Sequence, residues 1–344
     1  MKDVKYDSRL YYNMVQNYKE TQLLFSAIKL DIFSNLKEFT STKEVAINTG
    51  YDERNLGFYL NTLASIGLLE KKDGLYKNTL ESEYYLNKKS DHYLGEWILF
   101  REKMTSLNNI ENLVKNGPKI ELEKTNEGAN AYNFSEFARL SVNEIYSGRI
   151  QSFLKAMEKI YSNNKPNKIL DLGGGSGIMA IEFINAYPQA KGVIFEHPKV
   201  AEVPMEFVKE RNLEDKIQVI FGDFNVDSIG SGYDVVIASG IIDFSKNNPD
   251  FLIKKIYDSL NDGGYIYLVS HEVSEDYLRP RESIVGWLSS HLEGLDILLT
   301  KKTIVESLER IGFSKVQEDF FKGTIAKLTG EFYQKNKPLG EKNI

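Results

Sequence analysis

The stretch Asp171-Leu172-Gly173-Gly174-Gly175-Ser176-Gly177 decides the fold of this 344-residue chain. It closes an apolar run that begins at Lys168. Glycine lacks a Cβ and tolerates positive φ, so the loop can turn sharply and let the backbone approach a ligand closely. A glycine-rich turn after a strand is typical of nucleotide-binding α/β folds. Alone, it does not distinguish a dinucleotide from other nucleoside cofactors.

Apolar runs along the second half of the chain predict a parallel sheet. They are separated by stretches long enough for helices, and such alternation is typical of α/β proteins whose sheet is covered on both faces. In these sheets ligands bind outside the carboxyl ends of the strands, where the strand order reverses. The runs are 168–172, 192–195, 217–221, 233–238 and 265–269.

Acidic residues follow the next two strands at the same edge. Glu196 closes the second run about 20 residues after the glycines, where a carboxylate can accept both hydroxyls of a ribose. Asp223 and Phe224 close the third run, in position for an adenine amine and its ring face. Each acid alone could be a helix cap or part of a solvated turn. Three strand ends in register favour one nucleoside site.

The N-terminal region has a different pattern. Residues 8–36 read as a helix, a capped helix start follows at Thr40–Glu44, and a second helix runs over 52–67. Residues 68–77 then read as two short strands about an Asp-Gly turn. Together these elements predict a winged helix. Its second helix carries one basic residue, Arg54, which favours a dimerisation or lid role over DNA binding.

Composition narrows the functional classes further. The formal charge of -6 argues against a nucleic-acid partner, and the absence of cysteine with only four histidines argues against a metal centre. No apolar run is long enough to span a membrane, and Met1–Asp7 shows no secretory pattern, so we expect a cytoplasmic protein. The 20 tyrosines and 19 phenylalanines suit a pocket for a flat organic substrate, although most aromatic rings belong to the core.

These motifs resemble the S-adenosylmethionine-dependent O-methyltransferases of the plant caffeate and bacterial polyketide type. The resemblance rests on the glycine loop, Glu196-His197-Pro198, Gly222-Asp223-Phe224 and Asn261-Asp262-Gly263-Gly264. It implies an α/β, Rossmann-like doubly wound methyltransferase domain preceded by an α-helical winged-helix dimerisation domain. The implied organisation is a dimerisation domain at 1–100, a helical linker and pocket wall at 101–165, and a catalytic domain at 166–344.

The resemblance also implies roles for individual residues. Gly173 and Gly175 would flank the methionine part of S-adenosylmethionine, Glu196 the ribose, and Asp223 with Phe224 the adenine. Asp171 and Ser239 complete the expected cofactor-binding set. A homodimer and a small-molecule substrate are expected as partners. The expected substrate pocket consists of Asn143, Tyr146, Trp287 and His291.

The catalytic positions depart from this family, which usually has a histidine after the fourth strand as the base. An ungapped count back from Leu260 places Ile242 there, and the two supporting acids fall on Ser270 and Lys301. One explanation is an acceptor acidic enough to need only alignment, such as a carbon acid, a thiol or an acidic phenol. A second is a relocated base, either Asp243 or His271. A third is a cofactor-binding homologue with a non-methylating activity. As an alternative function, a ligand-responsive regulator that uses the winged helix also stays open.

Overall fold

The computed structural model describes residues 6–118, 132–162, 164–245, 248–320 and 328–336. The chain separates into two compact units, Met1–Arg101 and Glu102–Ile344. Two stretches used in the sequence predictions lie outside the described residues. They are residues 1–5, from the segment that shows no secretory pattern, and residues 337–344, from the expected catalytic domain. Within the described part of the chain, no helix has both the length and the apolar character that a membrane crossing requires.

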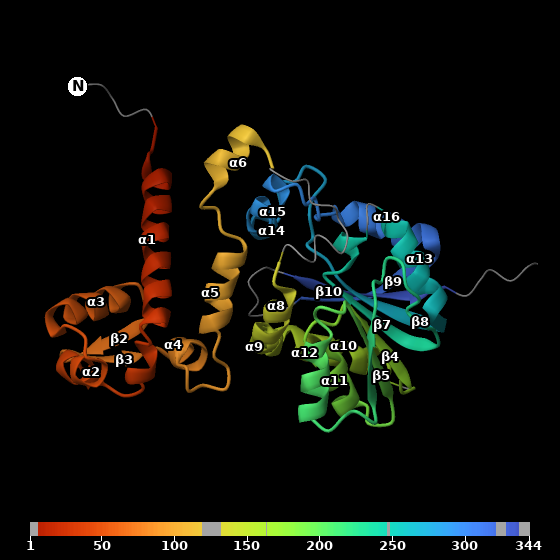
Figure 1. Ribbon diagram of the computed structural model, residues 1–344, viewed down its shortest axis with the longest axis horizontal. Helices are drawn as coiled ribbons and strands as arrows, with labels where there is room; N and C mark the ends of the chain where they lie inside the picture. The colour runs from red at the N-terminus through yellow and green to blue at the C-terminus, as the bar shows by residue number, and fades with distance from the viewer. Residues whose placement is uncertain (1–5, 119–131, 163, 246–247, 321–327, 337–344) are drawn as a thin grey trace, which may run out of the picture. The chain divides into compact units, whose positions relative to one another are not determined.

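The first unit has the predicted pair of helices followed by a hairpin (Figure 1). Ser41 and Glu44 form a capping box at the start of α2, and the Asp52 side chain caps α3 by accepting the N–H of Asn55. The hairpin strands pair around Asp73-Gly74 in a sheet ordered β1-β3-β2. The elements are α1 (Arg9–Lys29), η1 (Phe33–Asn35), β1 (Thr40–Ser41), α2 (Thr42–Thr49), α3 (Glu53–Ser65), β2 (Leu69–Lys72), β3 (Leu75–Asn78), α4 (Leu80–Leu86) and α5 (Gly95–Met104).

The second unit is built on a seven-stranded sheet with the order β6-β5-β4-β7-β8-β10-β9. All five predicted apolar runs form strands, and β4 to β8 pair in parallel, which confirms the α/β class. The strand order reverses between β4 and β7. The antiparallel pair β9 and β10 was not predicted. The strands are β4 (Lys168–Leu172), β5 (Lys191–Glu196), β6 (Ile217–Phe221), β7 (Tyr233–Ser239), β8 (Leu260–Val269), β9 (Phe313–Phe320) and β10 (Thr329–Lys335).

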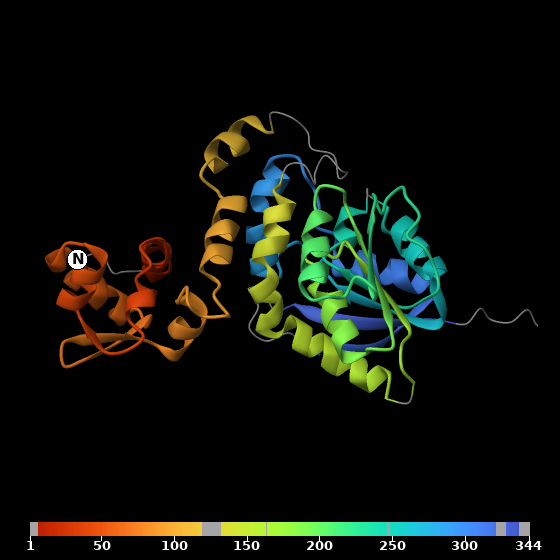
Figure 2. The ribbon, with the colours of Figure 1, turned by 60° about the horizontal axis from the view of Figure 1, so that its bottom comes forward.

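Helices cover both faces of this sheet (Figure 1, Figure 2). Ile169 enters a core cluster with α10 and α11, whereas its neighbour Leu170 enters a second cluster with α13 and α16. Successive strand residues point to opposite faces, so burial on both faces explains the continuous apolar runs. The helices are α6 (Ile110–Asn116), α8 (Phe134–Leu140), α9 (Val142–Glu144), η2 (Ile145–Arg149), α10 (Ile150–Ile160), α11 (Ile178–Ala186), α12 (Glu202–Glu210), η3 (Ile242–Phe244), α13 (Pro249–Ser259), α14 (Arg281–Gly286), α15 (Leu288–Leu292) and α16 (Lys301–Ile311).

Candidate active site

The glycine loop after β4 is packed closely between the ends of its neighbouring strands. Gly173 and Gly175 have φ values of 65° and 57°, in the left-handed region that favours glycine. The Gly173 N–H donates to the Phe195 carbonyl on β5 at 2.8 Å. A Cβ built on Gly173 would lie 2.5 Å from Cγ2 of Ile241, just beyond β7. A side chain at Gly173 therefore has no room.

Glu196, the last residue of β5, holds its carboxylate against this loop. Its Oε2 accepts the Gly175 N–H at 2.7 Å, and its Oε1 accepts the His197 N–H at 2.7 Å. The residue is 9% exposed, and burial raises the pKa of the Glu196 carboxyl. Each oxygen keeps a second lone pair, so the oriented carboxylate can accept two further hydroxyl groups.

Asp171 lies in β4 below the loop and is 2% exposed. Its Oδ2 accepts the Ala180 N–H from α11 at 3.3 Å. Burial raises the pKa of Asp171 to about 7; the hydrogen bond from Ala180 and the charge of Arg149 oppose this rise, and Glu196 adds to it. A ligand cation beside Asp171 would favour the charged carboxylate.

Asp223 and Phe224 follow β6 and complete the convergence on this edge. The Gly222 N–H donates to the Glu196 carbonyl at 3.1 Å, which ties the end of β6 to the end of β5. The Asp223 carboxylate is buried and accepts the Asn225 N–H at 2.9 Å. The Phe224 ring lies 3.9 Å from a Cβ built on Gly173. The structure therefore brings together the ends of β4, β5 and β6.

Arg149 also reaches this edge, and the sequence reasoning missed it. Its Nη2 donates to the Ser239 hydroxyl at the end of β7 at 2.8 Å, and its Nη1 donates to the buried Glu144 carboxylate at 3.1 Å. Gly148, with φ of 138°, interrupts the helical stretch just before Arg149. Gly148 is the feature of the sequence that could have indicated a functional position at Arg149, although this signal is weak.

The loops after β7 and β8 bring Asp243 and His271 into contact. Ile242, the residue that the ungapped count aligns with the usual histidine, is 1% exposed and packs in the second core cluster. The next residue, Asp243, is buried, and its Oδ2 lies 2.9 Å from Nδ1 of His271. The sequence reasoning named Asp243 and His271 as alternatives, whereas the structure makes them one hydrogen-bonded pair.

A group of aromatic rings packs beside this pair. The Trp287 ring stands edge-on to His271 with centroids 5.4 Å apart, and edge-on to Tyr132 at 6.5 Å. Phe134 on α8 contacts both Tyr132 and Phe244, at 5.7 and 6.1 Å between centroids. Tyr132 and Phe134 carried no sequence signal, because a ring in a loop or short helix is usually a core residue.

The other residues of the expected substrate pocket lie in varied surroundings. The Tyr146 hydroxyl donates to Glu182 on α11, and the Tyr146 ring packs against the first core cluster. Asn143 is half-buried on α9. His291 on α15 pairs through Nδ1 with Asp296 at 3.0 Å. Of the four expected pocket residues, the structure brings Trp287 into contact with the Asp243–His271 pair.

Ser270 and Lys301, which the same count aligns with the usual supporting acids, belong to a charged network. Lys301 donates to Glu272 at 2.8 Å and also contacts Glu331, which is 1% exposed on β10. The Ser270 hydroxyl donates to Glu272 at 3.0 Å. Lys301 therefore brings an ammonium group into this network, and its buried partner Glu331 comes from a strand that the sequence did not predict.

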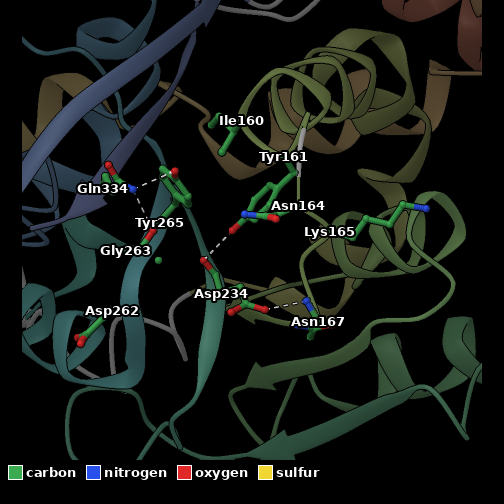
Figure 3. A pocket seen from close by; sticks show the side chains of 11 residues that line it. Ile160, Tyr161, Asn164, Lys165, Asn167, Asp234, Asp262, Gly263, Tyr265 and Gln334 are labelled. Atoms are coloured by element: carbon green, nitrogen blue, oxygen red, sulfur yellow. Dashed lines mark hydrogen bonds between the residues drawn. The ribbon is translucent and has the colours of Figure 1, made fainter. Parts of the chain in front are cut away.

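A cavity of about 390 Å³ lies at the opposite edge, beside the amino ends of β7 and β8 (Figure 3). Its central carboxylate, Asp234, already accepts the N–H groups of Asn167 and Lys168 and the Asn261 amide. The Gln334 amide donates to wall groups as well. These central polar groups of the cavity are already hydrogen-bonded within the protein, whereas ligands of such sheets bind at the carboxyl ends of the strands, so the candidate site is at the carboxyl edge. The cavity is lined by Ile160, Tyr161, Asn164, Lys165, Asn167, Asp234, Asp262, Gly263, Gly264, Tyr265 and Gln334.

The charges at the carboxyl edge suit the expected cofactor. Asp171, Glu196 and Asp223 supply carboxylates there, and Arg149 supplies a guanidinium group. S-Adenosylmethionine carries a sulfonium, an ammonium and one carboxylate, so its net charge is positive. A dinucleotide would instead bring two phosphates towards an acidic site. Among the described residues, no three His, Asp or Glu side chains converge as metal ligands would.

Comparison with known proteins agrees with the two-unit organisation. Residues 130–289 match the family model of the O-methyltransferase domain, and residues 12–88 match that of the O-methyltransferase dimerisation domain. The solved structure of human N-acetylserotonin methyltransferase in complex with S-adenosylmethionine has a similar fold, with a TM-score of 0.75 and 21% identity. That likeness covers 98% of this chain and 100% of the human one.

Two curated relatives illustrate the range of similar sequences. An uncharacterised protein of Methanocaldococcus jannaschii is 29% identical over 307 residues, 86% of this chain and 79% of the relative. The L-tyrosine C(3)-methyltransferase of Streptomyces lavendulae is 28% identical over 152 residues, 43% of this chain and 41% of that enzyme.

Proposed function

We propose that this chain, which belongs to the O-methyltransferase family with an N-terminal dimerisation domain, methylates a small aromatic or conjugated acceptor. S-Adenosylmethionine is the cofactor of this family. The observation that carries the proposal is the Glu196 carboxylate, which is oriented against the glycine loop by two backbone N–H groups at 2.7 Å. Such a group is prepared to bind a ribose.

We assign the parts of the cofactor to separate residues. Glu196 accepts the ribose hydroxyls, while Asp223 and Phe224 take the adenine amine and ring. The glycine loop, including Gly173 and Gly175, leaves room for the methionine chain. Arg149, held by Ser239, pairs with the cofactor carboxylate, and Asp171 faces its ammonium group.

When bound, the cofactor supplies a methyl group on a positively charged sulfur. The sulfur becomes a neutral thioether when the methyl group is transferred. The protein itself therefore has to orient the acceptor and keep water away. Helix α8 is suitably placed for both, because Ala138 lies 3.9 Å from a Cβ built on Gly175 and Phe134 joins the aromatic rings. This contact supports the proposal that segment 101–165 forms a pocket wall for the catalytic domain at 166–344.

The proposal for the acceptor rests on the aromatic rings of the site and on the acidity that the acceptor group needs. Tyr132, Phe134, Phe244 and Trp287 give a flat, conjugated molecule edges and faces to pack against. Ile242 cannot take a proton, which favours an acidic phenol, a thiol or a carbon acid over an ordinary alcohol. The similarity to a tyrosine C(3)-methyltransferase keeps a carbon acceptor among these classes.

We also propose a homodimer formed through the N-terminal unit. The first half of α1 exposes a row of large apolar side chains, and a solvent-exposed helix with such a face favours a protein partner. The match to a dimerisation domain supports a second copy of this chain as that partner. The exposed residues are Leu10, Tyr11, Tyr12, Met14, Val15 and Tyr18.

Calorimetric titration with S-adenosylhomocysteine tests the cofactor assignment. Glu196→Gln should weaken binding roughly 10- to 100-fold, because hydrogen bonds to a charged group are lost. Glu158→Gln, on the exposed face of α10, is the matched control and should bind as the wild type does. Incubation with methyl-labelled S-adenosylmethionine and a panel of phenols, thiols and carbon acids should then yield a labelled product. Tighter binding of NAD than of S-adenosylhomocysteine would overturn the proposal.

A further inference from the structure

Asp243 is a buried carboxylate with partners from distant parts of the chain. It lies in η3, just beyond the carboxyl end of β7, and is 2% exposed. Its Oδ1 accepts the Leu299 N–H at 2.9 Å, and its Oδ2 lies 2.9 Å from Nδ1 of His271. A buried carboxylate is costly unless it is hydrogen-bonded, so these two partners fix its orientation.

This contact defines which nitrogen of His271 is basic. An ionised carboxylate only accepts hydrogen bonds, so Nδ1 carries the proton and the neutral ring keeps its lone pair on Nε2. Within the described residues, Nε2 has no hydrogen-bond partner, and the side chain is 17% exposed. The Ser283 hydroxyl donates to the His271 carbonyl at 2.9 Å, and Trp287 stands against the ring. The imidazole is therefore held through Nδ1 and by Trp287, and its Nε2 is left for another group.

The pair lies next to the cofactor site by two independent contacts. Ile241, two residues before Asp243, packs against the position of a Cβ on Gly173. On α8, Ala138 approaches Gly175 and Phe134 reaches Phe244, the neighbour of Asp243. Residues four apart on a helix share a face about 6 Å apart. These contacts place the loop that carries Asp243, and through it the hydrogen-bonded pair, beside the proposed cofactor site.

A second His–Asp pair in the same unit serves as an internal control. His291 Nδ1 lies 3.0 Å from Oδ1 of Asp296, nearly the distance in the first pair. The Asp296 side chain, however, is 75% exposed, whereas that of Asp243 is 1% exposed. Water competes for an exposed carboxylate, so only the buried pair fixes its imidazole strongly.

We propose that His271 is the catalytic base of this enzyme and that Asp243 is its positioning residue. The proposal rests on the methyltransferase function above. His271 Nε2 takes the proton of the acceptor group, while the acceptor atom forms the bond to the methyl carbon. The C–S bond breaks and its electron pair stays on sulfur. The imidazolium, paired with the Asp243 carboxylate, then releases the proton to solvent. The base thus comes from the loop after β8 instead of the loop after β7.

Nitrogen NMR of histidine-labelled protein tests the dyad without any turnover. The chain has four histidines, so each ring can be assigned. We expect His271 to be protonated at Nδ1 and unprotonated at Nε2. Asp243→Asn presents an amide donor to Nδ1 and should move the proton to Nε2. Asp296→Asn should leave the His271 signals unchanged. A His271 ring protonated at Nε2 in the wild type would overturn the proposal.

A graded series of acceptors tests proton removal itself. With the phenol, thiol or carbon acid that the wild type methylates, substituted analogues of rising pKa are compared. His271→Gln and Asp243→Asn should lose roughly 10²- to 10⁴-fold in kcat for weakly acidic analogues and recover for analogues that ionise in water. Affinity for S-adenosylhomocysteine should stay within about twofold. Asp258→Asn, an exposed carboxylate on α13, is the activity control.

The outcomes separate this inference from the function on which it rests. Equal losses of kcat for all analogues would show a structural role for the pair and overturn the inference alone. Absence of any methylated product, with S-adenosylhomocysteine bound and His271 in the expected tautomer, would overturn the proposed function. Loss of S-adenosylhomocysteine binding in both variants would contradict the division between cofactor and acceptor residues.

Discussion

Glu196 and Asp243 are buried carboxylates on either side of β4, and the fold holds them in different ways. Glu196 accepts two backbone N–H groups, one from the next residue and one from the adjacent glycine loop. Asp243 accepts one backbone N–H from Leu299 and contacts the His271 ring. Backbone donors stay fixed when side chains change. The half of the site that we assign to the cofactor, around Glu196, therefore depends on backbone geometry. The half that we assign to the acceptor, around Asp243, depends on a contact between side chains.

The largest expected effect lies in the glycine loop. Gly173→Ala adds a left-handed strain of about 1–2 kcal/mol and a clash with Ile241 of about 1–3 kcal/mol, so we expect a loss of about 2–5 kcal/mol in unfolding free energy. Gly240→Ala, after β7, has φ of 72° with nothing within 4 Å of its Cβ, so the strain alone applies. Urea unfolding measures both. Equal losses would remove the contrast between the halves.

The next effect is a pH dependence of the cofactor half. Burial raises the pKa of Asp171 to about 7, so its contribution to stability is fully present below about pH 4 and is lost as the pH rises through about 7. The loss is on the order of 4 kcal/mol, because each pH unit between about pH 4 and pH 7 contributes about 1.4 kcal/mol. Thermal unfolding should show this trend in the ligand-free wild type but not in Asp171→Asn. Parallel pH profiles for both proteins would contradict the assignment.

The raised pKa of Asp171 also predicts a pH dependence of S-adenosylhomocysteine binding. If Asp171 faces the ammonium group, its charged form favours the ligand, and affinity for S-adenosylhomocysteine should rise several-fold between pH 6 and pH 8. Asp171→Asn should bind more weakly at pH 8 and lose most of this rise. Calorimetry at the two pH values gives the measurement. An unchanged slope in the variant would place the ammonium group elsewhere.

A smaller effect belongs to the acceptor half. The Tyr132 hydroxyl bonds to Ser290, which is fully buried on α15. Tyr132→Phe leaves that serine without this partner and should cost about 1–2 kcal/mol of unfolding free energy, with no change in S-adenosylhomocysteine affinity. The double variant with Ser290→Ala should cost less than the sum of the single variants. Additive losses would show that the two hydroxyls are independent.

The smallest expected effect concerns the surface of α8. Arg139 forms an ion pair with Glu206 on α12, and both side chains are about half exposed. Exposed pairs contribute about 0–1 kcal/mol, so Arg139→Gln should leave stability and cofactor affinity nearly unchanged. A tenfold loss of S-adenosylhomocysteine affinity would instead show that this pair holds α8 over the glycine loop.

Local patterns explain how far the fold could be predicted. The runs that became β4 to β8 are apolar because both faces of the sheet are buried, and the caps at Ser41 and Asp52 are set by residues three positions away. The pair β9 and β10 escaped prediction because its strands mix charged and apolar residues and join the sheet only through antiparallel pairing. Glu331, buried by contact with Lys301 and Lys315, shows that a charged strand residue can belong to the core.

The same distinction between local patterns and long-range contacts applies to the candidate site. Glycines and acids at strand ends follow from short-range sequence, because a parallel sheet places all carboxyl ends at one edge. The Asp243–His271 contact joins residues 28 positions apart, and the Leu299 contact joins residues 56 apart. Arg149 reaches Ser239 across 90 positions. No local pattern specifies such contacts, so the chemistry of the acceptor half required the structure.

A crystal structure of the complex with S-adenosylhomocysteine tests the central claim most directly. We predict that the ribose hydroxyls lie on the Glu196 carboxylate, with the adenine beside Phe224 and the sulfur between the glycine loop and His271. A nucleoside bound at the opposite edge beside Asp234, or one that leaves Glu196 without a ligand contact, would contradict the account.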